Sequence, residues 1–292
     1  MATVAEWFEG ARVRTWPNAI APVLVGTGAA AEIDGFAAGP FALSLAVALL
    51  LIIGVNFAND YSDGVRGTDA DRVGPFRLVG SGSAAPEQVR AAALTCFGLA
   101  AVAGLVAVVL TGYWWLLIVG ALCIAGAWFY TGGNRPYGYA GWGEMAVFVF
   151  FGLVAVLGTQ YVQAGEVTGS GLGAAVAVGA FSSAVLVANN LRDIPSDRTT
   201  GKRTLAVLLG DRDTRVLYVT LVLVPFLITI LVGFRNTLAL LSFAALPLLI
   251  VSLRSVLGRA TGGDLIPALR DTGIAMLAWA AITALALTFG QA

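Results

Sequence analysis

The run from Phe41 to Asp63, FALSLAVALLLIIGVNFANDYSD, decides the fold, because a long apolar stretch passes directly into an end rich in Asn and Asp. A helix needs about 20 apolar residues to cross the roughly 30 Å hydrocarbon core of a bilayer, and this stretch is long enough. The whole chain of 292 residues is 58% hydrophobic and only 12% charged. Soluble domains carry about a quarter charged residues, so this composition predicts an integral membrane protein.

Apolar runs of similar length recur along the chain, separated by charged or turn-rich breaks. They predict an all-α fold of nine membrane-spanning helices, with the two termini on opposite sides of the membrane. We expect the spans at about residues 17–33, 40–62, 88–111, 113–131, 142–164, 171–192, 214–233, 236–257 and 268–290.

The basic residues favour this number of spans. If the N-terminus is cytoplasmic, sixteen of the 17 Lys and Arg residues fall on the cytoplasmic side and only Arg235 falls outside. Such an excess of positive charge is typical of cytoplasmic loops. We therefore expect the N-terminus and the polar chemistry inside, and the C-terminus outside. The net charge of zero does not suggest a nucleic-acid partner, and the absence of His excludes His-bound metals and Ser-His-Asp catalysis.

Two long cytoplasmic loops begin with the same pattern. The first, ANDYSD, starts at Ala58, and the second, ANNLRD, starts at Ala188, so the offset is 130 residues with Ala, Asn and Asp in register. A repeat at a fixed offset predicts an internal duplication within one membrane domain spanning residues 1–292. The half-repeats would cover about 17–131 and 142–257, with a final helix at 268–290.

The spacing within each cluster places its oxygen-bearing side chains on one face of a helix. Asn59 and Asp63 are four residues apart, and Asn189, Asp193 and Asp197 follow the same spacing. Mg²⁺ prefers such oxygen ligands and shares its coordination with substrate phosphates, while Arg and Lys bind the remaining phosphate oxygens. Both clusters continue into basic residues. The pattern therefore indicates a magnesium–diphosphate site, against the alternative that these loops carry ordinary solvated charge.

The motifs resemble those of the UbiA superfamily of intramembrane aromatic prenyltransferases, whose first motif is Asn-Asp-x-x-Asp-x-x-x-Asp and whose second is Asp-x-x-x-Asp. The first motif opens at Asn59, and its final position is Gly67, with Asp69 two residues further on. This departure is typical of the naphthoquinone branch, which prenylates 1,4-dihydroxy-2-naphthoate in menaquinone synthesis. The resemblance covers essentially the whole chain, including RTWPN from Arg14 and YTGGNRPYGYAGWGE from Tyr130.

The resemblance implies nine helices around a central cavity, capped by cytoplasmic loops, in a bacterial cell membrane. It implies Mg²⁺ as cofactor, and a polyprenyl diphosphate and 1,4-dihydroxy-2-naphthoate as substrates. The product would be a demethylmenaquinone, formed with loss of CO₂ and diphosphate. The sequence leaves the isoprenoid length and the oligomeric state open.

The candidate site residues follow from the matched motifs and the polar loops beside them. The acids expected to act in catalysis are Asp60, Asp63, Asp69, Asp193 and Asp197, with Asp71 as an alternative to Asp69. The expected metal ligands are Asn59, Asp63, Asp69, Asn189, Asp193 and Asp197. The cations expected to bind the diphosphate are Arg72, Arg77, Arg135, Arg198, Lys202 and Arg203. The residues expected to contact the aromatic substrate are Arg14, Asn18, Asn56, Tyr130 and Tyr137.

Two other classes of membrane protein share parts of this pattern. Asp60-Tyr61-Ser62-Asp63-Gly64 fits the opening of a CDP-alcohol phosphatidyltransferase motif, but the rest of that motif is missing. Internal repeats also occur in transporters, whose sites usually lie near the bilayer midplane. Here the polar residues gather at the cytoplasmic helix ends, which favours the enzyme.

Overall fold

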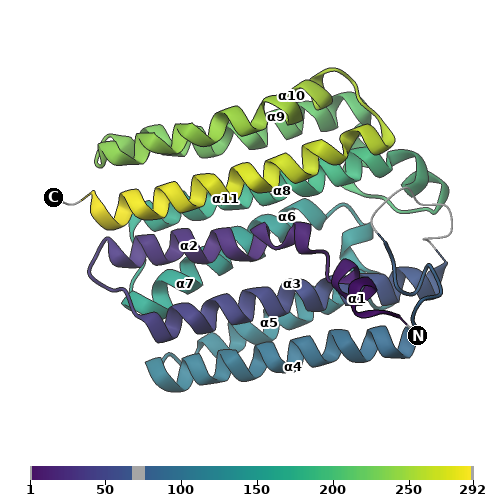
Figure 1. Ribbon diagram of the computed structural model, residues 1–292, viewed down its shortest axis with the longest axis horizontal. Coiled ribbons are helices and arrows are strands. Elements are labelled where there is room, and N and C mark those ends of the chain that lie inside the picture. The colour runs from purple at the N-terminus through teal and green to yellow at the C-terminus, as the bar shows by residue number, and fades with distance from the viewer. Residues whose placement is uncertain (1, 68–75, 291–292) are drawn as a thin grey trace.

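The computed structural model describes residues 2–67 and 76–290, and these two ranges are mainly helical, with no strand assigned in either (Figure 1). The α-helices are α1 (Val4–Gly10), α2 (Pro17–Ala31), α3 (Ala38–Arg66), α4 (Pro86–Thr111), α5 (Leu116–Phe129), α6 (Gly143–Val147), α7 (Ala155–Ala164), α8 (Gly169–Thr199), α9 (Leu205–Gly233), α10 (Ile250–Leu257) and α11 (Ile266–Phe289). The 3₁₀ helices are η1 (Val13–Thr15), η2 (Tyr137–Tyr139), η4 (Thr237–Leu249) and η5 (Gly262–Leu265), and η3 (Phe148–Val154) is a π-helix.

The long helices lie roughly parallel to one another, as expected of a multi-pass membrane protein (Figure 1). Within the described ranges, 7 helical segments are long and apolar enough to cross a membrane. Two of the nine predicted spans coincide with shorter helices, since α2 has 15 residues and α5 has 14. The seven long spans are confirmed by this criterion, and nine passes remain a prediction.

The central helix of the bundle is α8, which packs against neighbours through small and aromatic residues. Gly179 lies directly against the backbone of Gly152 in η3. A Cβ atom added to Gly152 would come within 2.5 Å of the Gly179 Cα atom. The Phe181 ring meets the Trp279 ring of α11 edge-on at 6.2 Å, and the Trp279 indole donates to Thr229 of α9 at 2.8 Å. Close helix approach through glycine is typical of membrane bundles. This packing fixes α8, which carries the second polar cluster.

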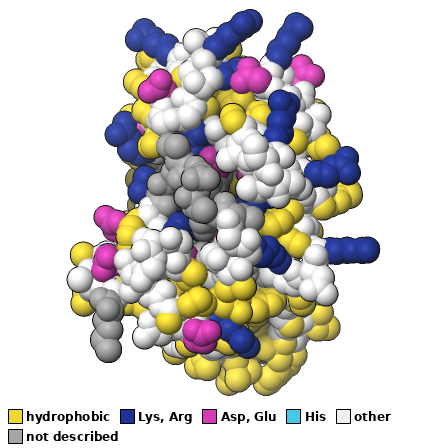
Figure 2. Space-filling model, turned by 90° about the vertical axis from the view of Figure 1, so that its right-hand side faces the viewer, with side chains coloured by type: hydrophobic (Ala, Val, Ile, Leu, Met, Phe, Trp, Pro, Cys, Tyr) yellow, Lys and Arg dark blue, Asp and Glu magenta, His cyan; other side chains and the backbone are white. Residues whose placement is uncertain are grey.

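Both polar clusters lie at the C-terminal ends of long helices, on the same end of the bundle. Asn59 and Asp63 belong to the last turns of α3, and Asn189 to Asp197 belong to the end of α8, as the helical spacing predicts. Lys and Arg side chains gather on this end (Figure 2). The helix α1 lies at this end too, while α11 finishes at the opposite end (Figure 1). The distribution agrees with an odd number of passes.

Gly67 gives a structural reason for the departure from the superfamily's first motif. Its φ of 71° is left-handed, and its N–H closes the C-terminus of α3 on the carbonyls of Asp63 and Gly64. A left-handed residue at this position is favourable for glycine and ends the helix. The helical row of candidate ligands therefore stops at Asp63, whereas the row on α8 continues to Asp197.

Candidate active site

A cavity of about 310 Å³ opens between the ends of α3 and α8, and its lining divides into a polar and an apolar part. The polar part is formed by Arg12, Thr15, Asn18, Asn56, Asn59, Asp63, Arg77, Tyr130, Thr131, Tyr137, Tyr139, Ser182, Asn189, Asn190, Asp197, Lys202 and Thr204. The apolar part includes Leu51, Ile52, Val55, Val147, Phe150, Phe151, Val185 and Leu186. One pocket thus holds side chains from both polar clusters beside a long apolar wall.

Asp63 is the most highly connected acid of the pocket. It is 3% exposed, and its carboxylate accepts from Arg77 at 3.2 Å and lies 3.6 Å from the Lys202 ammonium. The Tyr139 hydroxyl donates to the same carboxylate, and the Lys202 ammonium lies 4.5 Å from the centre of the Tyr139 ring. Charge-assisted contacts of this kind hold a carboxylate in one orientation. Asp63 therefore joins Arg77 and Lys202, two of the cations that line the pocket.

The two tyrosines of η2 act as hydrogen-bond donors at this end of the pocket. Burial raises the pKa of the Tyr139 phenol, and the neighbouring Asp63 carboxylate raises it further. Burial also raises the pKa of Tyr137 to about 12, and its hydroxyl donates to the carbonyl of Gly126 at 2.6 Å. Both phenols therefore keep their protons at neutral pH.

The second cluster contributes Asn189, Asn190 and Asp197 to the pocket lining. After α8 ends, Gly201 adopts a left-handed φ of 75°, and the chain turns so that the Lys202 N–H donates to the Asp197 carbonyl at 2.9 Å. The Thr204 hydroxyl donates to the Asp197 carboxylate at 3.3 Å. This turn brings Lys202 from the end of α8 to Asp63 of α3. The two clusters are connected through that lysine.

Asp193 lies one turn before Asp197 and is held by its own neighbour. The Arg192 guanidinium donates to both Asp193 oxygens, at 2.7 and 2.9 Å, and to Asn189 Oδ1 at 2.9 Å. Both side chains of the pair are 3% exposed. Asp193 is not among the described pocket-lining residues. Its carboxylate is near the pocket but is covered by Arg192 in this arrangement.

Asp60 faces away from the pocket. It is fully buried, and its two oxygens accept from the backbone N–H groups of Leu78 at 2.7 Å and Val79 at 3.1 Å. These contacts hold the segment that carries Arg77 against α3. The sequence predicted Asp60 as a catalytic acid, whereas its contacts indicate that it positions the Arg77 segment.

Replacing Asp60 by Ala is expected to lower stability before it affects chemistry. The change leaves two N–H groups beside α3 without their acceptor, at a cost of about 1–3 kcal/mol for each buried donor. We expect a lower apparent Tm of the detergent-solubilised protein, and weaker binding of an anionic ligand at Arg77 because the Arg77 segment is loosened. Thermal unfolding measured by intrinsic fluorescence checks this expectation. An unchanged Tm with complete loss of kcat would instead make Asp60 a catalytic residue.

The predicted cations separate into two groups. Arg77 and Lys202 line the pocket, whereas Arg135, Arg198 and Arg203 are exposed and lie outside its described lining. Asp69, Asp71 and Arg72 lie outside the described residues, so the choice between Asp69 and Asp71 stays open.

Arg12 lines the pocket although the sequence pointed to Arg14, which is exposed. Arg12 has a left-handed backbone (φ 52°, ψ 61°) between α1 and η1. Such a conformation is unfavourable for a non-glycine residue and is often found at functional sites. The turn sends the Arg12 side chain inward and leaves Arg14 on the surface.

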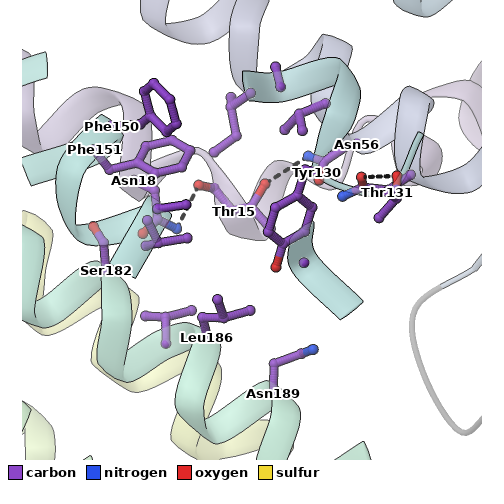
Figure 3. Close-up of a pocket in the computed structure, with 18 of the residues that line it drawn as sticks. Thr15, Asn18, Asn56, Tyr130, Thr131, Phe150, Phe151, Ser182, Leu186 and Asn189 are labelled. Atoms are coloured by element: carbon purple, nitrogen blue, oxygen red, sulfur yellow. Dashed lines mark hydrogen bonds between the residues drawn. The ribbon is translucent and has the colours of Figure 1, made fainter. Parts of the chain in front are cut away.

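The remaining predicted residues meet around the inner part of the pocket (Figure 3). Asn56 donates to the Thr15 hydroxyl at 2.9 Å and to the Ala11 carbonyl at 3.1 Å. Asn18 donates to the Thr15 carbonyl at 3.1 Å. In the view of Figure 3, Asn18 lies to the left of Thr15 and the Tyr130 ring lies to its right. Phe150 and Phe151 come from η3, a π-helical turn, and add aromatic rings to the wall. Such turns occur frequently at functional sites.

Sequence reasoning missed several lining residues. Thr131 donates to Asn59 Oδ1 at 2.7 Å, and Arg12 and Tyr139 were not assigned roles. The available signal was the glycine-rich run after Tyr130, YTGGNRPYGYAGWGE, which belongs to the family resemblance. Its residues 137–139 do enter the lining.

The oxygen-bearing side chains of the pocket are of the kind that holds Mg²⁺. Among the described residues, no group of three or more His, Cys, Asp and Glu side chains is arranged to hold a metal ion. The pocket instead combines two carboxylates, Asp63 and Asp197, with the amides of Asn59 and Asn189. One or two carboxylates, completed by water and substrate phosphate, are the usual protein share of a Mg²⁺ site. These residues fit Mg²⁺ bound together with a phosphorylated substrate.

Comparisons with known proteins point to one family. The profile of the UbiA prenyltransferase family matches residues 19–265. A 1,4-dihydroxy-2-naphthoate octaprenyltransferase of Mycobacterium tuberculosis is 57% identical over 291 residues, covering 100% of this chain and 99% of that protein. The enzyme with that name from Escherichia coli is 41% identical over 215 residues, covering 72% of this chain and 70% of that protein.

Solved structures show the same fold. A UbiA homolog from Archaeoglobus fulgidus bound to GPP and Mg²⁺ gives a TM-score of 0.66 at 12% identity, covering 97% of this chain and 99% of that chain. The apo structure of a UbiA homolog from Aeropyrum pernix K1 gives 0.65 at 18% identity, covering 92% of this chain and 96% of that chain. At these identities the likeness supports the fold alone.

Proposed function

The chain belongs to the UbiA prenyltransferase family, and we propose that it transfers a polyprenyl group from an allylic polyprenyl diphosphate to 1,4-dihydroxy-2-naphthoate. Diphosphate and CO₂ are released, and the product is a demethylmenaquinol, the reduced form of a demethylmenaquinone. The two mycobacterial relatives named for this activity match the chain over nearly its whole length, at 57% and 53% identity. That length of match supports the same activity in this enzyme.

The observation that carries the proposal is the meeting of Asp63 and Asp197 with Arg77 and Lys202 in one pocket. Asp63, Asp197, Asn59 and Asn189 would hold Mg²⁺, which supplies charge neutralisation for the leaving diphosphate when bound. The Archaeoglobus fulgidus homolog, which shares this fold, is bound to GPP and Mg²⁺, and this supports a divalent metal as the cofactor. Asp193 would join them once Arg192 turns away. Arg77 and Lys202 then bind the diphosphate oxygens that the metal leaves free.

The pocket residues favour substitution at the allylic carbon without a covalent enzyme intermediate. The carbon–oxygen bond to diphosphate breaks, and its electron pair leaves with the diphosphate, where the cations stabilise the new charge. A ring carbon of the naphthoate supplies the electron pair of the new carbon–carbon bond, and loss of CO₂ restores aromaticity. The apolar wall, including Phe150 and Phe151, keeps water from the allylic cation and binds the isoprenoid tail.

The membrane arrangement is part of the proposal. The nine spans surround one cavity as a single domain with an internal duplication, and the pocket opens toward the cytoplasm of a bacterial cell. The gathering of Lys and Arg at the pocket end supports this orientation (Figure 2). In that orientation the N-terminus is inside and the C-terminus is outside.

The activity itself gives the most direct test. Purified protein in detergent or nanodiscs, supplied with 1,4-dihydroxy-2-naphthoate, a polyprenyl diphosphate and Mg²⁺, is expected to form a prenylated, decarboxylated product. Chromatography with mass detection identifies the product, and a coupled assay measures diphosphate release. Chelation by EDTA should lower turnover at least about a hundredfold, because the leaving group loses its principal counter-charge.

Adding back excess Mg²⁺ after EDTA is the control and should restore the rate. Failure to form product with isoprenoids of several lengths would contradict the proposed reaction. Undiminished turnover in EDTA would leave the reaction in place but remove the metal from the mechanism.

A further inference from the structure

The Asn18 side chain is locked in place by its surroundings. It lies in the first turn of α2 and is 8% exposed. Its Nδ2 donates to the Thr15 carbonyl at 3.1 Å, and the Thr15 hydroxyl donates to the Arg12 carbonyl at 2.8 Å while accepting from Asn56. The bond to the Thr15 carbonyl requires the amide NH₂ on that side. The amide oxygen is therefore on the other side.

The Asn18 Oδ1 atom is buried and has no hydrogen-bond partner among the described residues. A buried polar atom without a partner costs free energy, and in a native structure it calls for an explanation. Asn18 lines the pocket, and Figure 3 shows it in the group that includes Thr15 and Phe151. The missing partner is therefore expected from a pocket ligand.

An amide oxygen can only accept a hydrogen bond, so the ligand group that reaches it must donate. Neither a diphosphate nor an isoprenoid tail carries a donor at neutral pH, and the naphthoate carboxylate is ionised. Among the substrate groups, only the ring hydroxyls of the proposed aromatic acceptor remain. The 1-hydroxyl donates internally to the adjacent 2-carboxylate, which leaves the 4-hydroxyl free to bind the protein.

We propose that Asn18 Oδ1 accepts a hydrogen bond from the 4-hydroxyl of the naphthoate and thereby fixes the orientation of the ring in the pocket. This inference rests on the proposed function, because it assumes that aromatic substrate. Asn18 is therefore a specificity residue, because it selects aromatic substrates that carry a hydroxyl at this position. The carboxylate of the substrate does not contact Asn18 Oδ1. The rings of Phe150 and Phe151 line the same pocket and offer flat apolar surface to the naphthalene.

The test compares affinities for two ligands that differ only in the hydroxyl. Calorimetric titration of the full-length protein in nanodiscs, with Mg²⁺ and without prenyl donor, gives Kd for 4-hydroxy-2-naphthoate and for 2-naphthoate. We expect the wild-type protein to prefer the hydroxylated ligand by about tenfold, the usual value of one neutral hydrogen bond to a buried acceptor. In Asn18→Leu the preference should fall below about twofold, with the affinity for 2-naphthoate retained.

Three further variants make the result specific. Asn18→Ala replaces the leucine variant if the larger side chain is not tolerated. Asn18→Asp keeps an acceptor oxygen and adds a charge, so it should weaken both naphthoates while retaining at least the wild-type preference for the hydroxylated ligand. Ser182→Ala is the matched control, because Ser182 lines the same pocket but its hydroxyl already donates to the Met276 sulfur at 3.4 Å. The control should keep the preference.

The outcomes separate the inference from the function on which it rests. Equal wild-type affinities for the two ligands, or an undiminished preference in Asn18→Leu and Asn18→Ala, would overturn the role of Asn18 while leaving prenyl transfer intact. If the wild-type protein neither bound these naphthoates nor formed product from 1,4-dihydroxy-2-naphthoate, the proposed function would fall, and the inference with it.

Discussion

Replacing Asp63 by Asn should lower kcat by about a thousandfold while leaving the protein folded. The Asp63 carboxylate contacts Arg77, Lys202 and the Tyr139 hydroxyl, and it lines the pocket with Asp197. Asn has nearly the same shape but carries no charge, so a metal ion would lose a carboxylate ligand and the two cations would lose their common partner. Loss of one preorganised electrostatic contact to a developing charge typically costs 10²–10³ in kcat, and Asp63 would affect several.

Steady-state product formation at saturating Mg²⁺ and substrates measures the Asp63→Asn effect, with the apparent Tm recorded in parallel. The matched control is Asp60→Asn on the same helix, because Asp60 binds the backbone of Leu78 and Val79 rather than the pocket. The control should retain far more activity and lose more stability. If Asp63→Asn kept more than a tenth of the wild-type kcat, the central role given to this acid would be wrong.

The sequence predicted the fold wherever the length of an apolar run decides whether a helix can cross the membrane. Runs such as 40–62 exceed the thickness of a bilayer, and seven of the expected spans are long apolar helical segments in the structure. The weaker cases were α2 and α5, which have only 15 and 14 residues. Length alone cannot decide whether such segments cross the membrane.

The site could be predicted only where helical spacing determines it. Asn59 and Asp63, which are four residues apart, and Asn189 and Asp197, which are eight apart, do lie in one pocket, because residues at these spacings share a helical face. The spacing could not show that Asp193 is covered by Arg192, since this depends on a rotamer.

Residues on irregular segments escaped prediction for a different reason. The side chains of Arg12 and Tyr139 reach the pocket through a left-handed turn and a short 3₁₀ turn, which sequence periodicity does not describe. Arg135, Arg198 and Arg203 failed to join the pocket because a basic residue near a motif can equally well face solvent. Local charge therefore predicted the kind of site but not its individual cations.

The second large effect is expected at Asp193, which the sequence assigned as a metal ligand and the structure pairs with Arg192. Asp193→Asn should lower kcat by at least about a hundredfold, because it removes a carboxylate from the second cluster. The change also leaves the buried Arg192 guanidinium without its partner. Breaking one side of a buried pair costs about 3–5 kcal/mol, so the apparent Tm should fall as well.

The double variant Arg192→Gln, Asp193→Asn separates these two effects. Removing both charges of a buried pair is often nearly neutral for stability, so the double variant should recover most of the lost Tm. It should not recover turnover, because the carboxylate that a metal ion would bind is still absent. Unfolding and product formation across a Mg²⁺ titration provide both readouts. Recovery of kcat together with Tm would mean that Asp193 serves only to hold Arg192, and that the metal is bound by Asp197 and the first cluster without it.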